Sequence, residues 1–373
     1  MKLQFLTPLY AHPGPIASAY LDTSRDRDDP DRAVESRWRK LRRSLLAHDA
    51  EQATVEAIAD AVGTDREVAG PHGQAVFAAH GKLVLAETLP EPPARDTALY
   101  GMLPDTLSLA LQHAPDIPYT VVILHRVHVP ERTAGRPAGH GGPDEELEID
   151  SESGRWPTSR VAPGARSHRR IPVDGWPEAV ERLVGELVTE MDAAGTEMVV
   201  VAGDPWAVNS LMRAAPSRLH GAFVKLKDGQ HRRREPGRAL LEEELAILLD
   251  GRLSERDRHQ VDTFLAQRAR HPEYVEGCAA GVAALQRGQA QTLILSRPVR
   301  LHRHLWVGAA PVHLALTGEE LSAFGLHYYW EEPAPGAALI RAAAGTQAEL
   351  ICVPDEELPI EDGVAVVLRY TGS

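Results

Sequence analysis

Several features that would assign this chain to a familiar class are absent from its sequence. It has only two cysteines, Cys278 and Cys352, and their separation matches neither a zinc-binding nor a disulfide spacing. No segment approaches the apolar length of a membrane span, and no signal-peptide pattern follows Met1. We therefore expect a soluble, cytoplasmic protein whose cysteines are small core residues.

Motifs of common hydrolases and nucleotide-binding proteins are also missing. The chain contains no Walker or Rossmann glycine pattern and no Gly-x-Ser-x-Gly elbow. It has no His-Glu-x-x-His or Cys-x-x-Cys metal motif, and the pair His302 and His304 has no evident third ligand. We therefore expect no cofactor, no metal ion, and neither nucleotide hydrolysis nor serine-hydrolase chemistry.

The overall charge is negative, with a formal net charge of −13. Proteins that bind free nucleic acid broadly are usually basic, so this charge argues against DNA binding. It leaves room for RNA contact through a local basic patch. The distribution of charge along the chain is therefore more informative than its sum.

The length of 373 residues predicts two or three domains. The pattern of helices and strands favours three domains of the α/β class, over residues 1–117, 118–230 and 238–373. A charged, Gly- and Pro-containing linker is expected between the second and third domains.

Hydrophobic periodicity predicts the main elements of the first two domains. A helix is expected from Pro30 to Ala47, and a hairpin is expected to turn at His80-Gly81. In the second domain, a continuous apolar run at 120–124 predicts a strand buried on both faces. A long amphipathic helix at 175–194 and a second buried strand at 198–202 follow, which indicates a sheet with parallel strands.

The third domain is predicted to begin with helices and to end with strands. Helices are expected at 239–249, 254–270 and 272–287, and strands at 292–295, 349–353 and 363–369.

The segment Arg155 to Ile171, RWPTSRVAPGARSHRRI, contains five arginines and no acidic residue. Guanidinium groups suit phosphate oxygens, and Gly164 would allow close approach of a backbone. The alternative is a solvated loop whose arginines pair with surface carboxylates. A second basic cluster occupies the linker and has the same two interpretations. The candidate RNA-binding residues are Arg155, Arg160, Gly164, Arg166, Ser167, His168, Arg169, Arg170, Arg232, Arg233 and Arg234.

Four segments together resemble the archaeo-eukaryotic release factor and pelota proteins, and above all their bacterial relatives. That group includes ribosome hibernation factors and Vms-type peptidyl-tRNA hydrolase-like proteins. The first segment, at 20–45, is similar to the start of the bacterial members. The second comprises the strand, arginine segment, helix and strand of residues 119–204. The third and fourth, at 278–296 and 362–370, resemble the C-terminal domain.

The resemblance implies a release-factor-like middle domain with a mixed sheet and a C-terminal domain like kink-turn-binding ribosomal proteins. In release factors a middle-domain loop carries Gly-Gly-Gln before an arginine-containing helix, and the glutamine positions a water molecule. The segment that resembles it here, Pro163 to Arg170, has no glutamine. His168 is a conceivable base, but no carboxylate near it in sequence would orient it. We therefore expect no catalytic residues.

The resemblance thus implies a ribosome-binding translation factor that acts in hibernation or stress. It would occupy the A site without cutting peptidyl-tRNA and would contact ribosomal RNA. Transfer RNA and a translational GTPase are further partners left open, and neither a membrane nor DNA is expected. Two alternatives remain: a peptidyl-tRNA hydrolase that rescues stalled ribosomes, and a protein-binding stress factor that does not contact RNA.

Overall fold

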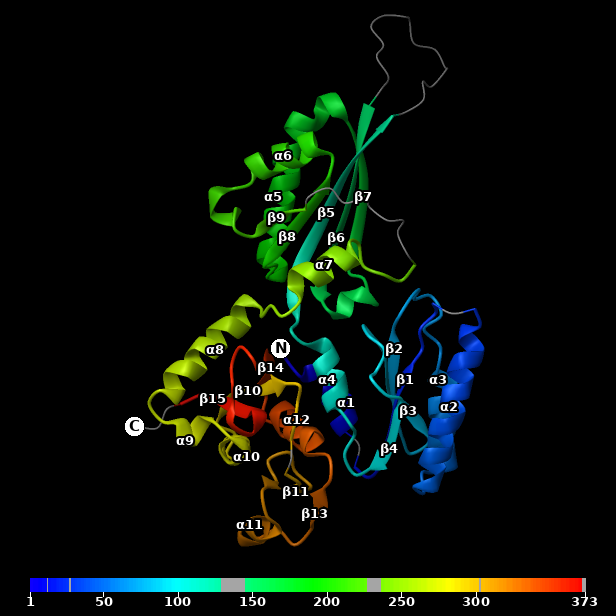
Figure 1. The fold of residues 1–373 in the computed structure, drawn as a ribbon, viewed down its shortest axis with the longest axis vertical. Helices are drawn as coiled ribbons and strands as arrows, with labels where there is room; N and C mark the ends of the chain where they lie inside the picture. Colours follow the sequence, from blue (N-terminus) through cyan, green and yellow to red (C-terminus); the bar gives the residue numbers. More distant parts are fainter. Residues whose placement is uncertain (12, 27, 129–144, 227–235, 302, 371–373) are drawn as a thin grey trace, which may run out of the picture. The chain divides into compact units, whose positions relative to one another are not determined.

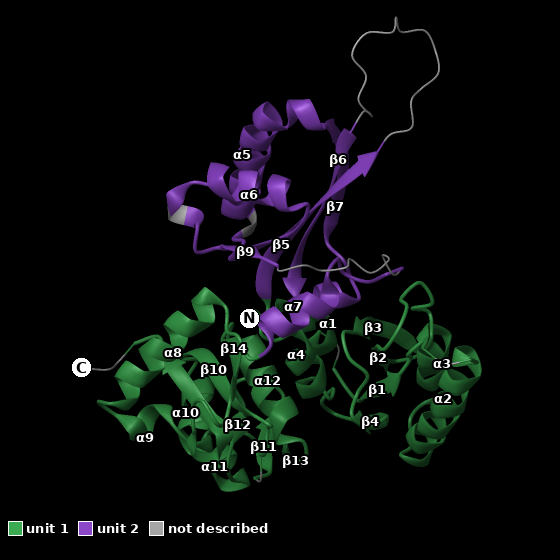
Figure 2. Cartoon of the chain, turned by 45° about the horizontal axis from the view of Figure 1, so that its top comes forward, with its two compact units in different colours: residues 1–116, 251–373 green, residues 117–250 purple. Residues whose placement is uncertain are grey.

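The computed structural model describes the chain except at residues 12, 27, 129–144, 227–235, 302 and 371–373. Helices and strands alternate through it (Figure 1), so the predicted α/β class is confirmed. Contacts group the chain into two compact units, residues 1–116 with 251–373 and residues 117–250 (Figure 2). The division of the first unit into two separate domains stays a prediction.

The N-terminal part of the first unit is built on an antiparallel sheet with the strand order β3-β2-β1-β4. Its strands are β1 (Ile16–Asp22), β2 (Gly73–Ala79), β3 (Lys82–Leu89) and β4 (Thr97–Gly101). Helices α2 (Pro30–Ala47) and α3 (Gln52–Ala61) bury their apolar sides against one face of this sheet. The predicted hairpin is confirmed, because β2 and β3 pair across His80-Gly81, and both turn residues have positive φ.

The C-terminal part of this unit contains a sheet of order β14-β10-β15 and a small second sheet of order β12-β11-β13. The strands are β10 (Ala290–Arg297), β11 (Leu305–Gly308), β12 (Leu314–Ala315), β13 (Tyr329–Glu332), β14 (Glu349–Pro354) and β15 (Val364–Leu368). The accompanying helices are α8 (Glu255–Arg268), α9 (Pro272–Val275), α10 (Cys278–Gln286), α11 (Gly318–Ala323) and α12 (Pro335–Gly345). Short elements at η1 (Gln4–Leu6), α1 (Thr7–Tyr10), α4 (Leu107–His113) and η5 (Glu361–Gly363) complete the unit. Cys278 and Cys352 are both buried, as predicted.

The single helix predicted at 272–287 is wrong, because the chain breaks between α9 and α10. Gly277 has a φ of 91°, and its N–H donates to the carbonyl of Val364. Glu276 also forms a bridge with Ala365 of β15. Pairing with a strand distant in sequence therefore interrupts a helix that local periodicity favours.

The second unit contains a five-stranded mixed sheet of order β7-β6-β5-β8-β9. The strands are β5 (Ile117–His128), β6 (Glu145–Trp156), β7 (Ala165–Pro172), β8 (Met198–Gly203) and β9 (Phe223–Lys225). Strands β5, β8 and β9 are parallel, whereas β6 is antiparallel to both β5 and β7. The buried strand β5 carries apolar side chains on both faces, as its sequence predicted.

Helices cover both faces of this sheet. Helices α5 (Trp176–Ala194) and α6 (Pro205–Ala214) pack on the face that carries Val122 and Leu124. Helix α7 (Glu242–Leu249) buries Leu245 and Leu249 with the residues of the opposite face, which include Tyr119. The sequence placed α7 at the start of the last domain, but these contacts group it with residues 117–250. Short 3₁₀ turns lie at η2 (Thr158–Arg160), η3 (Val173–Gly175) and η4 (Ser217–Leu219).

Candidate functional site

The arginine segment predicted as a loop is largely a β-strand. Ala165–Pro172 forms β7, which lies at an edge of the sheet and pairs with β6 along its length. Gly164 precedes it, and a Cβ atom there would collide with the carbonyl of Ser153. Gly164 is thus required by close packing of its own chain, which the sequence alone did not indicate.

Strand β6 supplies the acidic residues that the arginine segment lacks. In the β6–β7 register, Arg166 lies opposite Glu152, His168 opposite Asp150 and Arg170 opposite Glu148. The N···O distances are 2.6 Å for Arg166 Nε to Glu152 Oε2, 3.0 Å for His168 Nδ1 to Asp150 Oδ1, and 3.0 Å for Arg170 Nη2 to Glu148 Oε1. We call these three pairs the charge ladder. Opposite charges directly across neighbouring strands stabilise their pairing.

Residues on the other face of β7 also have partners within the unit. The hydroxyl oxygens of Ser167 and Ser151 lie 2.7 Å apart, and Arg169 forms an ion pair with Glu186 of α5. Arg169 therefore points away from Arg166 and Arg170, because alternate side chains of a strand lie on opposite faces. Arg166 and Arg170 are four residues apart, or roughly 13 Å along an extended strand. The candidate residues of β7 therefore lie along an extended strand and on both of its faces, and they do not form one cluster.

Burial separates Arg166 from the other cations of β7. The Glu152 side chain is 0% exposed and that of Arg166 is 21% exposed, whereas His168, Arg169 and Arg170 are 51%, 44% and 57% exposed. Burial raises the pKa of Glu152, which Arg166 and the N–H of Leu240 counteract. Arg166 is thus a structural partner of a buried carboxylate, whereas the side chains of His168, Arg169 and Arg170 are accessible.

The remaining candidates lie elsewhere. Arg160 forms an ion pair with Glu242 at 2.9 Å and lies over the Trp156 ring, so it ties η2 to α7. Arg155 is exposed near the end of β6 and has an interaction of its own. The second basic cluster, Arg232, Arg233 and Arg234, lies outside the described residues.

The fold indicates a second segment that can be compared with the Gly-Gly-Gln loop. That loop precedes a helix in release factors, but residues 163–170 lead into a strand. The connection that precedes a helix here is Pro172 to Gly175, just before α5. It contains no glutamine, and neither does the segment from Pro163 to Arg170. The glutamines of the matched region, Gln230, Gln260 and Gln267, lie in neither of these two segments.

His168 does have an orienting carboxylate, contrary to the prediction from its sequence neighbours. Asp150 contacts Nδ1 at 3.0 Å, and Glu148 Oε1 lies 3.3 Å from Nε2. Both partners come from β6, about twenty residues away, so only strand pairing reveals them. A histidine held in this way could act as a base if a substrate reached it.

The histidine pair at 302 and 304 forms no grouped metal site within the described part of the chain. His304 pairs with Glu331 at 2.9 Å, and His302 lies outside the described part of the chain. Among the residues that the structure describes, no three His, Cys, Asp or Glu side chains are grouped so as to hold a metal ion. No helix within that part of the chain is long and apolar enough to cross a membrane.

A model of a known protein family matches nearly all of the second unit and the twenty residues that follow it. Residues 118–270 match the model of bacterial archaeo-eukaryotic release factor family 2. Uncharacterised proteins from two Mycobacterium tuberculosis strains, CDC 1551 and H37Rv, are 27% identical to this chain, covering 100% of it and 98% of each relative.

Solved structures with similarity include archaeal translation termination factor aRF1, Archaeoglobus fulgidus Pelota and S. cerevisiae Dom34. Their identities are 14%, 14% and 10%, and their TM-scores are 0.21, 0.32 and 0.34. The alignments cover 98%, 80% and 81% of this chain and 96%, 80% and 80% of those chains. At these scores they support no transfer of individual residues. The match of residues 118–270 carries the conclusion that the predicted resemblance is confirmed: this chain resembles the bacterial archaeo-eukaryotic release factors.

Proposed function

We propose that this chain is a ribosome-associated translation factor of the release-factor type that does not cut peptidyl-tRNA. One observation carries the proposal: residues 118–270 match a release-factor family model, yet neither Pro163 to Arg170 nor Pro172 to Gly175 contains a glutamine. Hydrolysis of the ester requires a water molecule held at a fixed place by a polar group. A factor without that group can occupy the site but lacks the known means of cleavage.

The proposed mechanism is occupancy of the A site, which keeps idle ribosomes out of translation during hibernation or stress. Such a protein would act in the cytoplasm, and delivery by a translational GTPase is part of the same proposal. Shape complementarity can support this binding even though the molecule is acidic overall, provided that local cations meet RNA phosphates.

In β7, the exposed side chains of His168, Arg169 and Arg170 are the proposed phosphate contacts. Exposed ion pairs are worth only about 0–1 kcal/mol, so their carboxylate partners can be exchanged for phosphate. Arginine forms strong bidentate bonds to phosphate, and counterion release adds to binding. Arg166 is excluded from this exchange because its removal would leave Glu152 buried without a cation. Arg155 and the linker residues Arg232 to Arg234 remain proposed contacts.

Co-sedimentation with ribosomes tests the proposal. The wild-type chain should sediment with ribosomes, and the double variant R169E/R170E should sediment less, increasingly so at higher salt. The matched control R182E/R213E changes the same charge on helices α5 and α6 and should behave like the wild type. If the wild-type chain stays in the supernatant, the proposal fails. If the wild-type chain and R169E/R170E sediment with ribosomes equally, β7 has no role in RNA binding.

A second candidate is a peptidyl-tRNA hydrolase, which the His168–Asp150 contact favours. Ribosomes that carry peptidyl-tRNA should release no peptide when the wild-type chain is added. Release that disappears in His168→Ala, but persists in the control variant, would replace the proposed function with this enzyme.

A further inference from the structure

The outer side of helix α2 is the most cationic helical surface of this acidic chain. Residues 30–47 contain six basic and two acidic side chains, whereas the chain as a whole has a net charge of −13. The basic residues are Arg32, Arg37, Arg39, Lys40, Arg42 and Arg43. This surface belongs to the first unit, whereas the β7 candidates belong to the second.

The packing of α2 fixes which side chains face solvent. Val34, Trp38, Leu41 and Leu45 are buried against the sheet and α3. Arg37 is turned toward the end of β1, where its Nη2 lies 2.5 Å from Asp22 Oδ2 and its Nε lies 3.6 Å from Asp96 Oδ2. The buried side chains and these ion pairs fix the rotation of the helix about its axis, so its remaining basic residues lie on the opposite, solvent-facing side.

Those remaining residues form a row. Arg32, Arg39 and Arg43 are spaced by seven and four residues, so they lie along one side of the helix over roughly 16 Å. Lys40 and Arg42 flank the row, and all five are exposed. We call these five residues the α2 basic face. Within the described structure Arg39 is the member with an ion pair, to Glu35, and that pair is 66% and 68% exposed. In contrast to the arginines of β7, the other four residues of this face form no ion pair with another residue that the structure describes.

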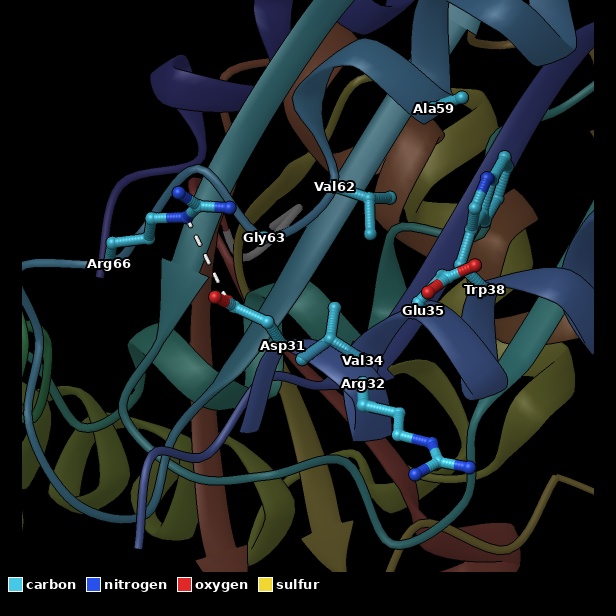
Figure 3. A pocket seen from close by; sticks show the side chains of 9 residues that line it. All are labelled: Asp31, Arg32, Val34, Glu35, Trp38, Ala59, Val62, Gly63 and Arg66. Carbon is cyan, nitrogen blue, oxygen red and sulfur yellow. Dashed lines mark ion pairs between the residues drawn. The ribbon is translucent and has the colours of Figure 1, made fainter. Parts of the chain in front are cut away.

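A cavity of about 590 Å³ adjoins the N-terminal end of this face. Its apolar lining includes Val34, Trp38 and Val62 (Figure 3). Four charged side chains also line it, namely Arg32, Arg66, Asp31 and Glu35. Arg66 is held near Asp31, with Nε and Oδ1 3.8 Å apart. The cavity is thus partly apolar and partly charged, and its size falls within the range of ligand sites.

We propose that the α2 basic face binds single-stranded RNA, with Arg32, Arg39 and Arg43 on successive phosphates and one unpaired base in the adjoining cavity. The inference rests on the proposed function and adds a second RNA contact to it. Single-stranded RNA is bound by combining a cationic track with hollows or platforms for unstacked bases. Insertion into a membrane does not fit, because the apolar side of α2 is already buried in the core.

The test uses the full-length chain and a fluorescently labelled single-stranded oligouridylate, with binding followed by anisotropy at several salt concentrations. Variant R39E/R43E should bind about tenfold or more weakly at low salt, and the slope of log affinity against log salt should become shallower by about 1.4. The matched control R258E/R287E places the same charge change on α8 and at the end of α10, and should bind like the wild type. Thermal unfolding should show that both variants fold, since all four arginines are exposed.

Unchanged binding by R39E/R43E would overturn the inference. Duplex RNA of the same length that binds as tightly as the single strand would overturn the role of the cavity. Binding of the wild-type chain to phosphatidylserine vesicles, without binding to the oligonucleotide, would replace RNA by an anionic lipid surface.

Co-sedimentation separates this inference from the function on which it rests. If wild-type chain and R39E/R43E both sediment with ribosomes equally, the α2 basic face is not a ribosome contact, while the proposed function stands. If the wild-type chain does not sediment, the proposed function fails, and the oligonucleotide result alone decides whether the face binds RNA.

Discussion

Arg166→Ala provides the sharpest test of how the charge ladder works. The substitution removes the guanidinium group that lies 2.6 Å from the carboxylate of Glu152. Glu152 would then keep the N–H of Leu240 at 3.1 Å and the more distant hydroxyl of Tyr119 at 3.5 Å. A carboxylate that is 0% exposed would therefore lose its cation without gaining water.

Removing one partner of a buried ion pair destabilises a protein by about 3–5 kcal/mol. We expect about 3 kcal/mol here, because Arg166 is 21% exposed and the Leu240 N–H remains. Arg170→Ala is the matched control on the same strand and face. Its pair with Glu148 is exposed, so the loss should stay below about 0.5 kcal/mol.

Urea denaturation measures the difference, with hydrogen exchange of peptides from β6 and β7 as the local measurement. With a slope of about 2 kcal/mol per molar urea, the midpoint for Arg166→Ala should fall by about 1.5 M. Exchange should accelerate in β6 and β7, whereas peptides from β10 and β14 should exchange as in the wild type.

The loss should also depend on pH in a definite direction. Burial already raises the pKa of Glu152, and Arg166 opposes this rise. Without Arg166 the folded-state pKa is higher still, so folding takes up a proton at pH values between the ordinary glutamate pKa and the raised one. Stability of the variant should therefore rise as pH falls through that window. If Arg166→Ala is as stable as Arg170→Ala at neutral pH, the assignment of Arg166 to the fold is refuted.

Two further predictions concern packing in the second unit. Gly164→Ala should destabilise the protein by about 2 kcal/mol or more, because the new Cβ would meet the Ser153 carbonyl. Gly185→Ala lies on α5 with open space around it, so it should stabilise the protein by about 0.5–1 kcal/mol. Urea denaturation of both variants measures the contrast. Leu245→Ala should cost about 2–5 kcal/mol and accelerate exchange in β5 and β8, and Ile247→Ala, where the side chain is 81% exposed, should be near neutral. Exchange that accelerates in α8 and β10 but not in β5 would show that α7 belongs with the last part of the chain.

Local patterns determined much of the fold. The apolar stripe of α5, the continuous apolar runs of β5 and β8 and the turn at His80-Gly81 each fixed an element, because period and turn chemistry act over a few residues. The absence of glutamine from Pro163 to Arg170 was likewise visible in the sequence and supports the proposed loss of cleavage.

Tertiary pairing decided what the sequence left open at the candidate site. The segment from Arg155 to Ile171 contains no acid, so it looked unpaired, but β6 places Glu152, Asp150 and Glu148 directly opposite its cations. The same pairing gives His168 a carboxylate partner and buries Glu152. The charges that face a strand belong largely to the strand paired with it. Which strand that is depends on the fold of the whole sheet and cannot be read from adjacent residues.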